Sequence, residues 1–188
     1  MSGVPGFDDD IWEAVPEEPG PPPAHLAEFA ESLAPAEEAL DLGCGDGRLT
    51  ALVHAQRVTG ADVSDVALTR ARRRLPDADL VKLEPDEPLP FPDSHFDLVV
   101  CTETIEHVRD TQLFLSEIRR VLRPGGRLAL TTPGGSRWRV LLFGIEHPFS
   151  PHLRTFTRRS LRMVLDSMGF HVLELEQRRR TLMTVAVR

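Results

Sequence analysis

Short apolar runs alternate with segments of helical periodicity along most of this chain of 188 residues. The apolar runs have the composition of buried strands and cover residues 39–42, 58–63, 78–83, 96–101 and 127–131. Between them the 3.6-residue period recurs over residues 47–56, 64–75 and 111–122. Alternating strands and helices are typical of a parallel sheet with right-handed crossovers and helices on both faces. The pattern therefore predicts an α/β fold.

The end of the chain departs from this alternation. Residues 157–168 are predicted to form a helix that stops at Gly169. Two strand-like runs follow, at 170–176 and 182–187, with only a short polar stretch between them. We expect these two strands to pair antiparallel.

The first 23 residues differ in composition from the rest. Residues 1–23 are acidic and rich in proline, so we expect an arm without a regular element. Three large apolar residues of the arm either fold over a cleft or a partner or make incidental contacts: Phe7, Ile11 and Trp12. Residues 24–188 are predicted to form a single domain, and a chain of this length buries roughly 70% of its unfolded surface.

Charge is distributed unevenly around a net value of −7. Residues 1–38 carry ten Asp or Glu and no Lys or Arg, whereas residues 119–188 carry fourteen Arg and four acids. Pairing or solvation of the two ends explains this pattern, and a site for an anionic substrate is the alternative. The two cysteines lack a zinc spacing, and no apolar run approaches the roughly 20 residues of a membrane helix. We expect a cytoplasmic protein without membrane association.

Three glycines at alternate positions follow the first predicted strand. Gly43, Gly45 and Gly47 stand between a strand and a predicted helix, where glycine permits tight turns and lets a ligand touch bare backbone. The spacing differs from the GxGxxG of dinucleotide folds, and Asp41 would repel a pyrophosphate. A second acid, Asp62, ends the next strand, where ribose hydroxyls are the usual partner. The pattern favours a cationic ligand over a dinucleotide.

Four motifs in this order resemble the class I S-adenosylmethionine-dependent methyltransferases. They are LDLGCGDG at 40–47, Asp62, LPFPD at 89–93 followed by Phe96-Asp97, and LRPGG at 122–126. The resemblance implies a Rossmann-like sandwich with a mostly parallel seven-stranded sheet, a C-terminal antiparallel pair and helices on both faces.

The same resemblance implies which residues bind S-adenosylmethionine. Gly43 and Gly45 would approach its methionine part, while Asp41 would fix the ammonium group. Asp62 would hold the ribose and Val63 would lie beside the adenine. The family's acid for the adenine amino group is replaced here by Pro85, so Glu84 or Asp86 must substitute for it. Cys44 and Thr102 complete the predicted set.

A dense polar cluster follows the fourth predicted strand. Glu103, Glu106 and His107 would share one face if the turn is helical. Such a trio suits Mg²⁺ or Mn²⁺, with His147 or His152 as a further ligand. The cluster resembles the metal site of the small-RNA 3′-terminal 2′-O-methyltransferases, which implies Glu103, Glu106, His107 and His152 as ligands.

The Glu-His pair also resembles metal-free small-molecule methyltransferases of the ubiquinone-biosynthesis type, in which His107 only borders the substrate or cofactor. His107, His147 or His152 would then assist deprotonation of the acceptor. The leading hypothesis is methyl transfer to an oxygen, nitrogen or carbon of a small molecule, by a monomer or a dimer. The alternatives are metal-dependent 2′-O-methylation of RNA 3′ ends and a cofactor-binding subunit without catalysis.

Overall fold

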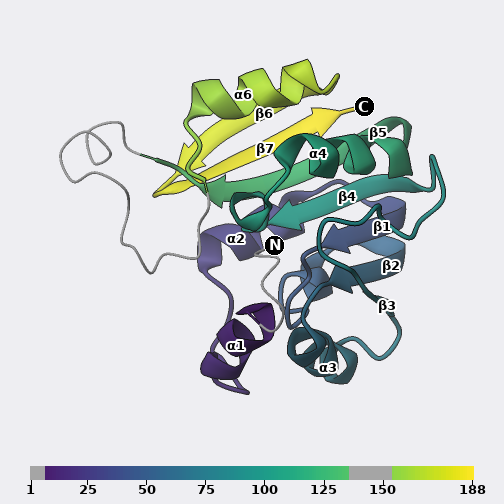
Figure 1. Ribbon diagram of the computed structural model, residues 1–188, viewed down its shortest axis with the longest axis vertical. Helices are drawn as coiled ribbons and strands as arrows, with labels where there is room; N and C mark the ends of the chain where they lie inside the picture. The colour runs from purple at the N-terminus through teal and green to yellow at the C-terminus, as the bar shows by residue number, and fades with distance from the viewer. Residues whose placement is uncertain (1–6, 136–153) are drawn as a thin grey trace.

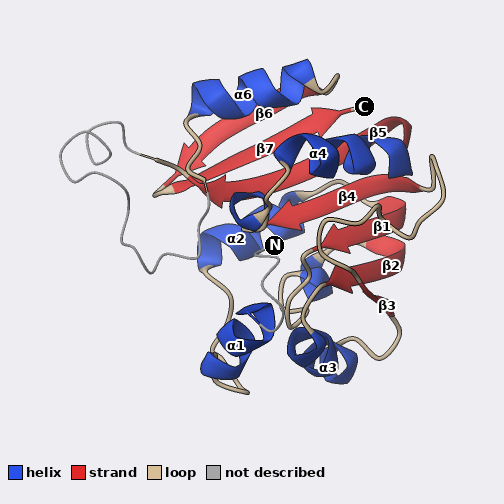
Figure 2. Ribbon diagram, viewed as in Figure 1, coloured by secondary structure: helices blue, strands red, loops and turns tan. Residues whose placement is uncertain are grey.

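The computed structural model describes residues 7–135 and 154–188. A sheet of seven strands forms its centre, in the order β3-β2-β1-β4-β5-β7-β6 (Figures 1 and 2). The strands from β3 to β5 pair in parallel, and β7 pairs antiparallel with both β5 and β6. The strands are β1 (Ala36–Leu42), β2 (Ala55–Asp62), β3 (Asp79–Lys82), β4 (Phe96–Thr102), β5 (Leu122–Pro133), β6 (His171–Arg178) and β7 (Thr181–Val187). The predicted architecture, including the C-terminal antiparallel pair, is confirmed.

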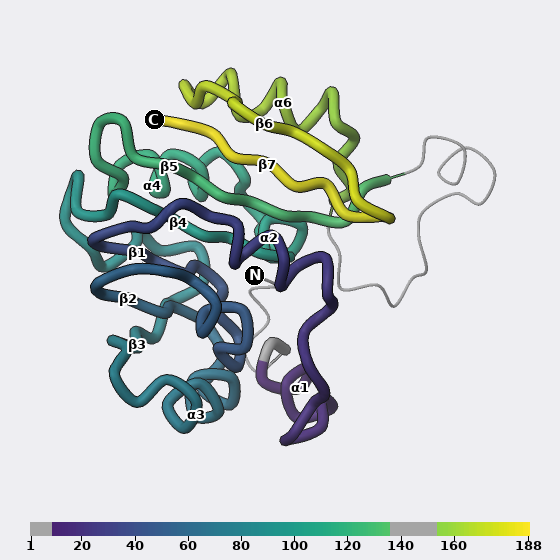
Figure 3. Tube along the Cα trace, turned by 180° about the vertical axis from the view of Figure 1, so that it is seen from behind, coloured from purple at the N-terminus to yellow at the C-terminus, as the bar shows by residue number. Residues whose placement is uncertain are grey.

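Helices lie on both faces of the sheet. α4 and α6 lie on the face that is nearer the viewer in Figure 1, and α2 crosses the opposite face, seen in Figure 3. The helices are α1 (Phe7–Ala14), α2 (Ala24–Ser32), α3 (Asp65–Arg74), α4 (Thr111–Val121) and α6 (Arg158–Ser167), with 3₁₀ turns η1 (Thr50–Leu52) and η2 (Ile105–His107). None of the helices within residues 7–135 and 154–188 is long and apolar enough to cross a membrane.

The core consists of two layers, one on each face of the sheet. Successive strand residues point to opposite faces, so β4 contributes to both layers. Val99 and Cys101 join the cluster that contains the buried residues of α4 and α6. Leu98 and Val100 join the cluster that contains the apolar residues of α2. This alternation explains why residues 98–101 of β4 are all apolar, as residues of a strand buried on both faces should be.

One predicted helix is wrong. Residues 47–56 carry helical periodicity, yet only Thr50–Leu52 is helical, and β2 already begins at Ala55. Ala55 pairs with Ala36 at the start of β1. The hydrogen-bonding register of the sheet therefore extends β2 into residues whose side-chain pattern suggested a helix.

The expectation that the arm lacks regular structure is also wrong, because residues 7–14 form α1. Asp9 and Asp10, near the start of this helix, suit the positive end of the helix dipole. Acidic residues near the N-terminus pair with two separate regions, Glu17 with Arg73 of α3 and Glu28 with Arg178 of β6. The acidic segment thus contacts α3 as well as the basic C-terminal region.

Candidate functional site

The carboxyl ends of β1, β2 and β4 lie along one edge of the sheet, toward which their arrowheads point in Figure 1. β1 pairs with β2 on one side and with β4 on the other. The chain order therefore reverses at β1. In open α/β sheets, ligands bind outside the carboxyl ends of strands at such a switch point.

The glycine turn begins directly after β1. The N–H groups of Gly43 and Cys44 both donate to the carbonyl of Ala61, at 2.8 and 3.1 Å, which ties the turn to β2. Gly43 has φ +80°, and a Cβ there would collide with the side chain of Thr104. Only glycine meets both conditions without strain. The turn is thereby held close to the segment that follows β4.

Asp62 at the end of β2 is held by two backbone donors. Its Oδ2 accepts a hydrogen bond from Gly45 N–H at 2.8 Å, and its Oδ1 accepts one from Ser64 N–H at 2.9 Å. Each carboxylate oxygen can accept a further hydrogen bond. A fixed carboxylate beside the glycine turn is therefore suited to paired hydroxyl groups such as those of a ribose.

Only one of the two carboxylate oxygens of Asp41 has a hydrogen-bond partner in the described structure. The side chain is 1% exposed; Thr50 Oγ1 donates to Oδ2 at 2.6 Å, while Oδ1 has no hydrogen-bond partner in the described structure. Burial raises the pKa of Asp41 to about 7, and the nearby charge of Asp62 adds to the rise. A buried acceptor without a donor is costly. A cationic donor at this position would remove that cost, so Asp41 fits the ammonium group of the predicted cofactor.

The two candidates for adenine binding line a cavity. Glu84 and Asp86 border a cavity that is partly open to solvent and whose apolar wall includes Leu42, Leu83 and Leu89. Asp86 also lies within ion-pair distance of Arg109, at 3.7 Å. An apolar cavity with acids at its edge has the composition that an aromatic ring with an amino group requires.

The remaining predicted cofactor residues are more buried. Val63 is 9% exposed and belongs to the core cluster of α4 and α6. Cys44 is 7% exposed and its Sγ lies near Gly60 of β2, so burial raises the pKa of its thiol. Thr102 is also 7% exposed, and its carbonyl accepts from Thr104 Oγ1 at 3.0 Å. The described contacts of Cys44 and Thr102 are structural.

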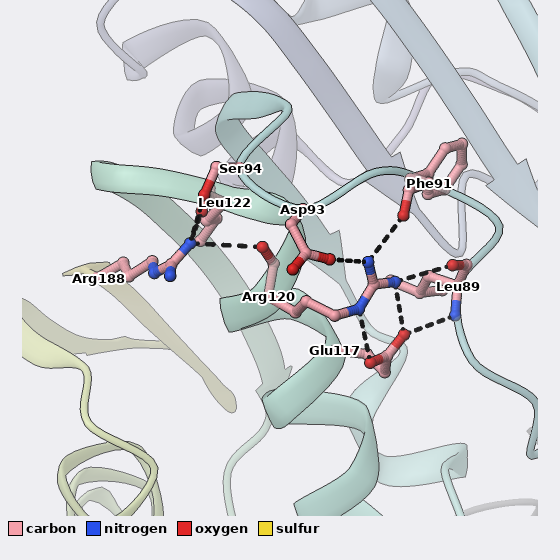
Figure 4. Close-up of polar contacts among 8 residues, drawn as sticks. All are labelled: Leu89, Phe91, Asp93, Ser94, Glu117, Arg120, Leu122 and Arg188. Atoms are coloured by element: carbon pink, nitrogen blue, oxygen red, sulfur yellow. Dashed lines mark hydrogen bonds and ion pairs between the residues drawn. The ribbon is translucent and has the colours of Figure 1, made fainter.

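The LPFPD loop at the cavity edge is clamped by one arginine (Figure 4). The Arg120 guanidinium donates to the carbonyls of Leu89 and Phe91 at 2.9 and 2.8 Å and to Asp93 at 2.7 Å. Glu117 accepts from both Arg120 and the Leu89 N–H, at 2.8 Å in each case. The loop therefore depends on α4 for its position.

The partly buried Glu103 and the buried Glu106, which follow β4, lie beside two threonines of β5. Thr131 Oγ1 donates to Glu103 at 2.9 Å, and Thr132 Oγ1 donates to Oε2 of Glu106 at 3.0 Å. Glu106 is 1% exposed, and its Oε1 has no hydrogen-bond partner in the described structure. Burial, together with the charge of Glu103, raises the pKa of Glu106 to about 8. The sequence pattern did not identify the two threonines, although Thr131 ends the strand predicted over 127–131 and Thr132 follows it.

His107 lies next to this pair. Its Nε2 is 3.9 Å from Oε1 of Glu106, and the turn that carries both residues is a 3₁₀ turn. Residues 7–135 and 154–188 contain no group of three or more His, Cys, Asp or Glu placed to hold a metal ion. His147 and His152 lie outside the described residues. The metal set that included His152 therefore stays a prediction.

The sheet order, the glycine turn after β1 and the acid after β2 together define a class I methyltransferase fold. Residues 40–130 of the chain match the model of the methyltransferase domain family. A methyltransferase structure from Bacillus halodurans superposes with a TM-score of 0.75 at 19% identity, over 87% of this chain and 97% of that chain.

Two relatives extend the comparison. The chain is 36% identical to a probable S-adenosylmethionine-dependent methyltransferase of Mycolicibacterium smegmatis, over 72% of this chain and 52% of the relative. It is 38% identical to a demethylmenaquinone methyltransferase of Symbiobacterium thermophilum, over 58% of this chain and 48% of the relative. The chain thus spans about half the length of these relatives.

Proposed function

We propose that the chain transfers a methyl group from S-adenosylmethionine to an oxygen, nitrogen or carbon nucleophile of a small molecule in the cytoplasm. Residues 24–188 would form the methyltransferase domain, preceded by the arm of residues 1–23. The observation that carries the proposal is the buried Asp41, whose unpartnered oxygen lies beside the glycine turn and suits a cationic ligand. The match of residues 40–130 to the methyltransferase domain family supports the same cofactor.

Several acidic residues near the carboxyl ends of the strands each have a role in this proposal. Asp41 holds the ammonium group, Asp62 the ribose hydroxyls, and Glu84 or Asp86 the adenine amino group. The bound sulfonium supplies the activated methyl group, and its transfer is an in-line displacement that depends mainly on alignment. His107 assists removal of the acceptor's proton, either directly or together with Glu106, from which it is 3.9 Å away.

The choice of a small-molecule acceptor rests on the relatives. One of them is named demethylmenaquinone methyltransferase, and the similarity extends over 58% of this chain. We therefore place aromatic hydroxyl compounds and quinols first among the acceptors to be tested.

The experiment is transfer of a labelled methyl group from S-adenosylmethionine to a panel of quinols, phenols and amines. We expect transfer to at least one small molecule and its loss in Asp62→Asn, while Asp77→Asn on an exposed loop leaves it unchanged. Parallel reactions contain EDTA, Mn²⁺ or an RNA with a free 3′ end. Labelling of the RNA 3′ end only with Mn²⁺ would contradict the proposal and support the metal-dependent alternative.

A further inference from the structure

α1 contacts the segment that follows Asp62. Asp9 Oδ1 accepts hydrogen bonds from Ser64 Oγ at 2.5 Å and from the backbone N–H of Val66 at 3.3 Å. Ser64 is the residue that caps α3, since its Oγ accepts from Ala67 N–H. The hydrogen bond from Ser64 holds the pKa of Asp9 below its usual range. Asp9 is therefore a fixed negative charge at the N-terminus of α3.

The same helix also contacts the glycine turn. A Cβ placed on Gly45 would lie 2.5 Å from Cζ2 of Trp12, so the indole lies directly on the bare backbone of this glycine. The Arg70 guanidinium carbon is 6.0 Å from the centroid of the Trp12 ring. Trp12 is thus held between α3 and the turn.

The segment after α1 is hydrogen-bonded to α3 and to the residue that follows the glycine turn. Arg70 Nη1 donates to the carbonyls of Val15 and Pro16, at 3.0 and 3.3 Å. Arg48, which follows the glycine turn, donates to the carbonyl of Gly20 at 2.7 Å. Residues 9–20 therefore run from the start of α3 to the far end of the turn, and α1 lies beside α3 (Figure 1).

These contacts meet at Asp62. Its carboxylate accepts from the N–H groups of Gly45 and Ser64, the two residues against which Trp12 and Asp9 lie. We propose that α1 forms the outer wall of the cofactor site and that Trp12 and Asp9 are positioning residues for the bound cofactor. This inference rests on the proposed function. It assigns a role to residues outside the matched segment, which begins at residue 40.

In this proposal α1 affects the cofactor site through two contacts, that of Trp12 with Gly45 and that of Asp9 with Ser64. Packing of the indole on Gly45 excludes water from the turn on which the methionine part would lie. The Asp9 hydrogen bonds keep Ser64, and with it the Asp62 carboxylate, in place for the ribose. Loss of either contact leaves the sheet intact but frees one of the two donors that hold Asp62. The expected consequence is faster release of the cofactor rather than loss of the fold.

The test measures binding of S-adenosylhomocysteine to the full chain, by calorimetry for Kd and by chasing bound labelled ligand for the dissociation rate. We expect Trp12→Ala and Asp9→Ala each to raise Kd about tenfold through faster dissociation. Trp12→Phe should restore most of the affinity, and Glu13→Ala, exposed on the same helix, should change nothing. The unliganded Tm of each variant, measured in parallel, separates loss of positioning from loss of the fold.

Three results would overturn the inference. If the wild-type chain binds S-adenosylhomocysteine and both alanine variants keep its Kd and dissociation rate, α1 has no part in the site. Tighter binding by the alanine variants would mean that α1 competes with the cofactor. If the wild-type chain itself does not bind, the proposed function fails and the inference fails with it. Should Trp12→Ala not fold, Asp9→Ala decides alone.

Discussion

Three buried carboxyl groups near the carboxyl ends of the strands have one oxygen each without a hydrogen-bond partner in the described structure. Oδ2 of Asp46 is ion-paired with Arg48 and Arg74, whereas Asp41 Oδ1 and Glu106 Oε1 have no ion pair with an arginine within the described residues. Burial raises the pKa of Asp41 and Glu106, to about 7 and about 8. Groups with such values change charge near neutral pH and are typical of functional sites. Asp41 lies in β1, and Glu106 lies in the 3₁₀ turn that follows the adjacent strand β4. Their different surroundings suggest different roles.

Asp41 makes cofactor binding depend on pH. Its folded pKa of about 7 means that the carboxyl is largely protonated at pH 6 and ionised at pH 8. An ammonium group binds the ionised form, so affinity for S-adenosylhomocysteine should rise about tenfold between pH 6 and pH 8. Asp41→Asn should bind more weakly and show a flat profile in calorimetric titrations. Parallel profiles for the two proteins would contradict the assignment of Asp41 to the ammonium group.

Glu106 should affect stability rather than cofactor affinity. Because its folded pKa is raised, the folded state holds a proton that the unfolded state releases between about pH 4.5 and pH 8. Stability from this group is present at low pH and is lost as the pH rises through that range. Denaturant unfolding should therefore show Glu106→Gln gaining about 3 kcal/mol on the wild-type chain between pH 5 and pH 9. A constant difference would show that Glu106 titrates normally.

At the scale of elements, the strands could be predicted from the sequence, whereas the segment 47–56 and helix α1 could not. Apolar runs such as residues 98–101 of β4 are unambiguous, because strand residues buried on both faces are mostly apolar. The helix predicted over 47–56 was wrong because the register of β2 with β1 decided the conformation of its last residues. α1 was missed because its aspartates and the prolines outside it in the arm resemble a disordered segment, whereas contacts with α3 stabilise the helix.

In the candidate site too, the positions of some residues could be predicted from local sequence, and those of others could not. Asp41, Gly43, Gly45 and Asp62 were predictable because strand ends and turns fix them in sequence and space together. Thr131 and Thr132 were not, since their contact with Glu103 and Glu106 joins positions 26 to 28 residues apart across two strands. Such pairings depend on sheet order, which local patterns do not contain.

Arg120 of α4 links that helix to the loop at the edge of the cavity (Figure 4). Arg120→Ala removes donors from three loop residues and leaves Glu117 partly buried without its cation. We expect a loss of about 3 kcal/mol in the free energy of unfolding, and little rescue by Arg120→Lys, which lacks the planar fork. Chemical denaturation measures both. Full rescue by lysine would show that charge alone, not the geometry of the fork, holds the loop.

At the scale of the whole molecule, helices protect both faces of the sheet and leave its carboxyl edge for the ligand. The core clusters occupy the two faces, whereas the glycine turn, Asp62 and the Glu103–Glu106 pair gather at the edge. α1 lies at the same edge, beside α3 (Figure 1). Stability and binding are thereby assigned to different parts of the molecule, so variants at the edge can lose binding and still fold.

The central claim is that this edge binds S-adenosylmethionine, and calorimetric titration of the full chain with S-adenosylhomocysteine tests it most directly. The account predicts one ligand per chain and an affinity at least about tenfold weaker in Asp62→Asn, whose amide retains the shape but not the charge. Asp77→Asn should match the wild-type chain. Absence of binding to the folded wild-type chain, or equal binding by Asp62→Asn, would contradict the assignment of the site.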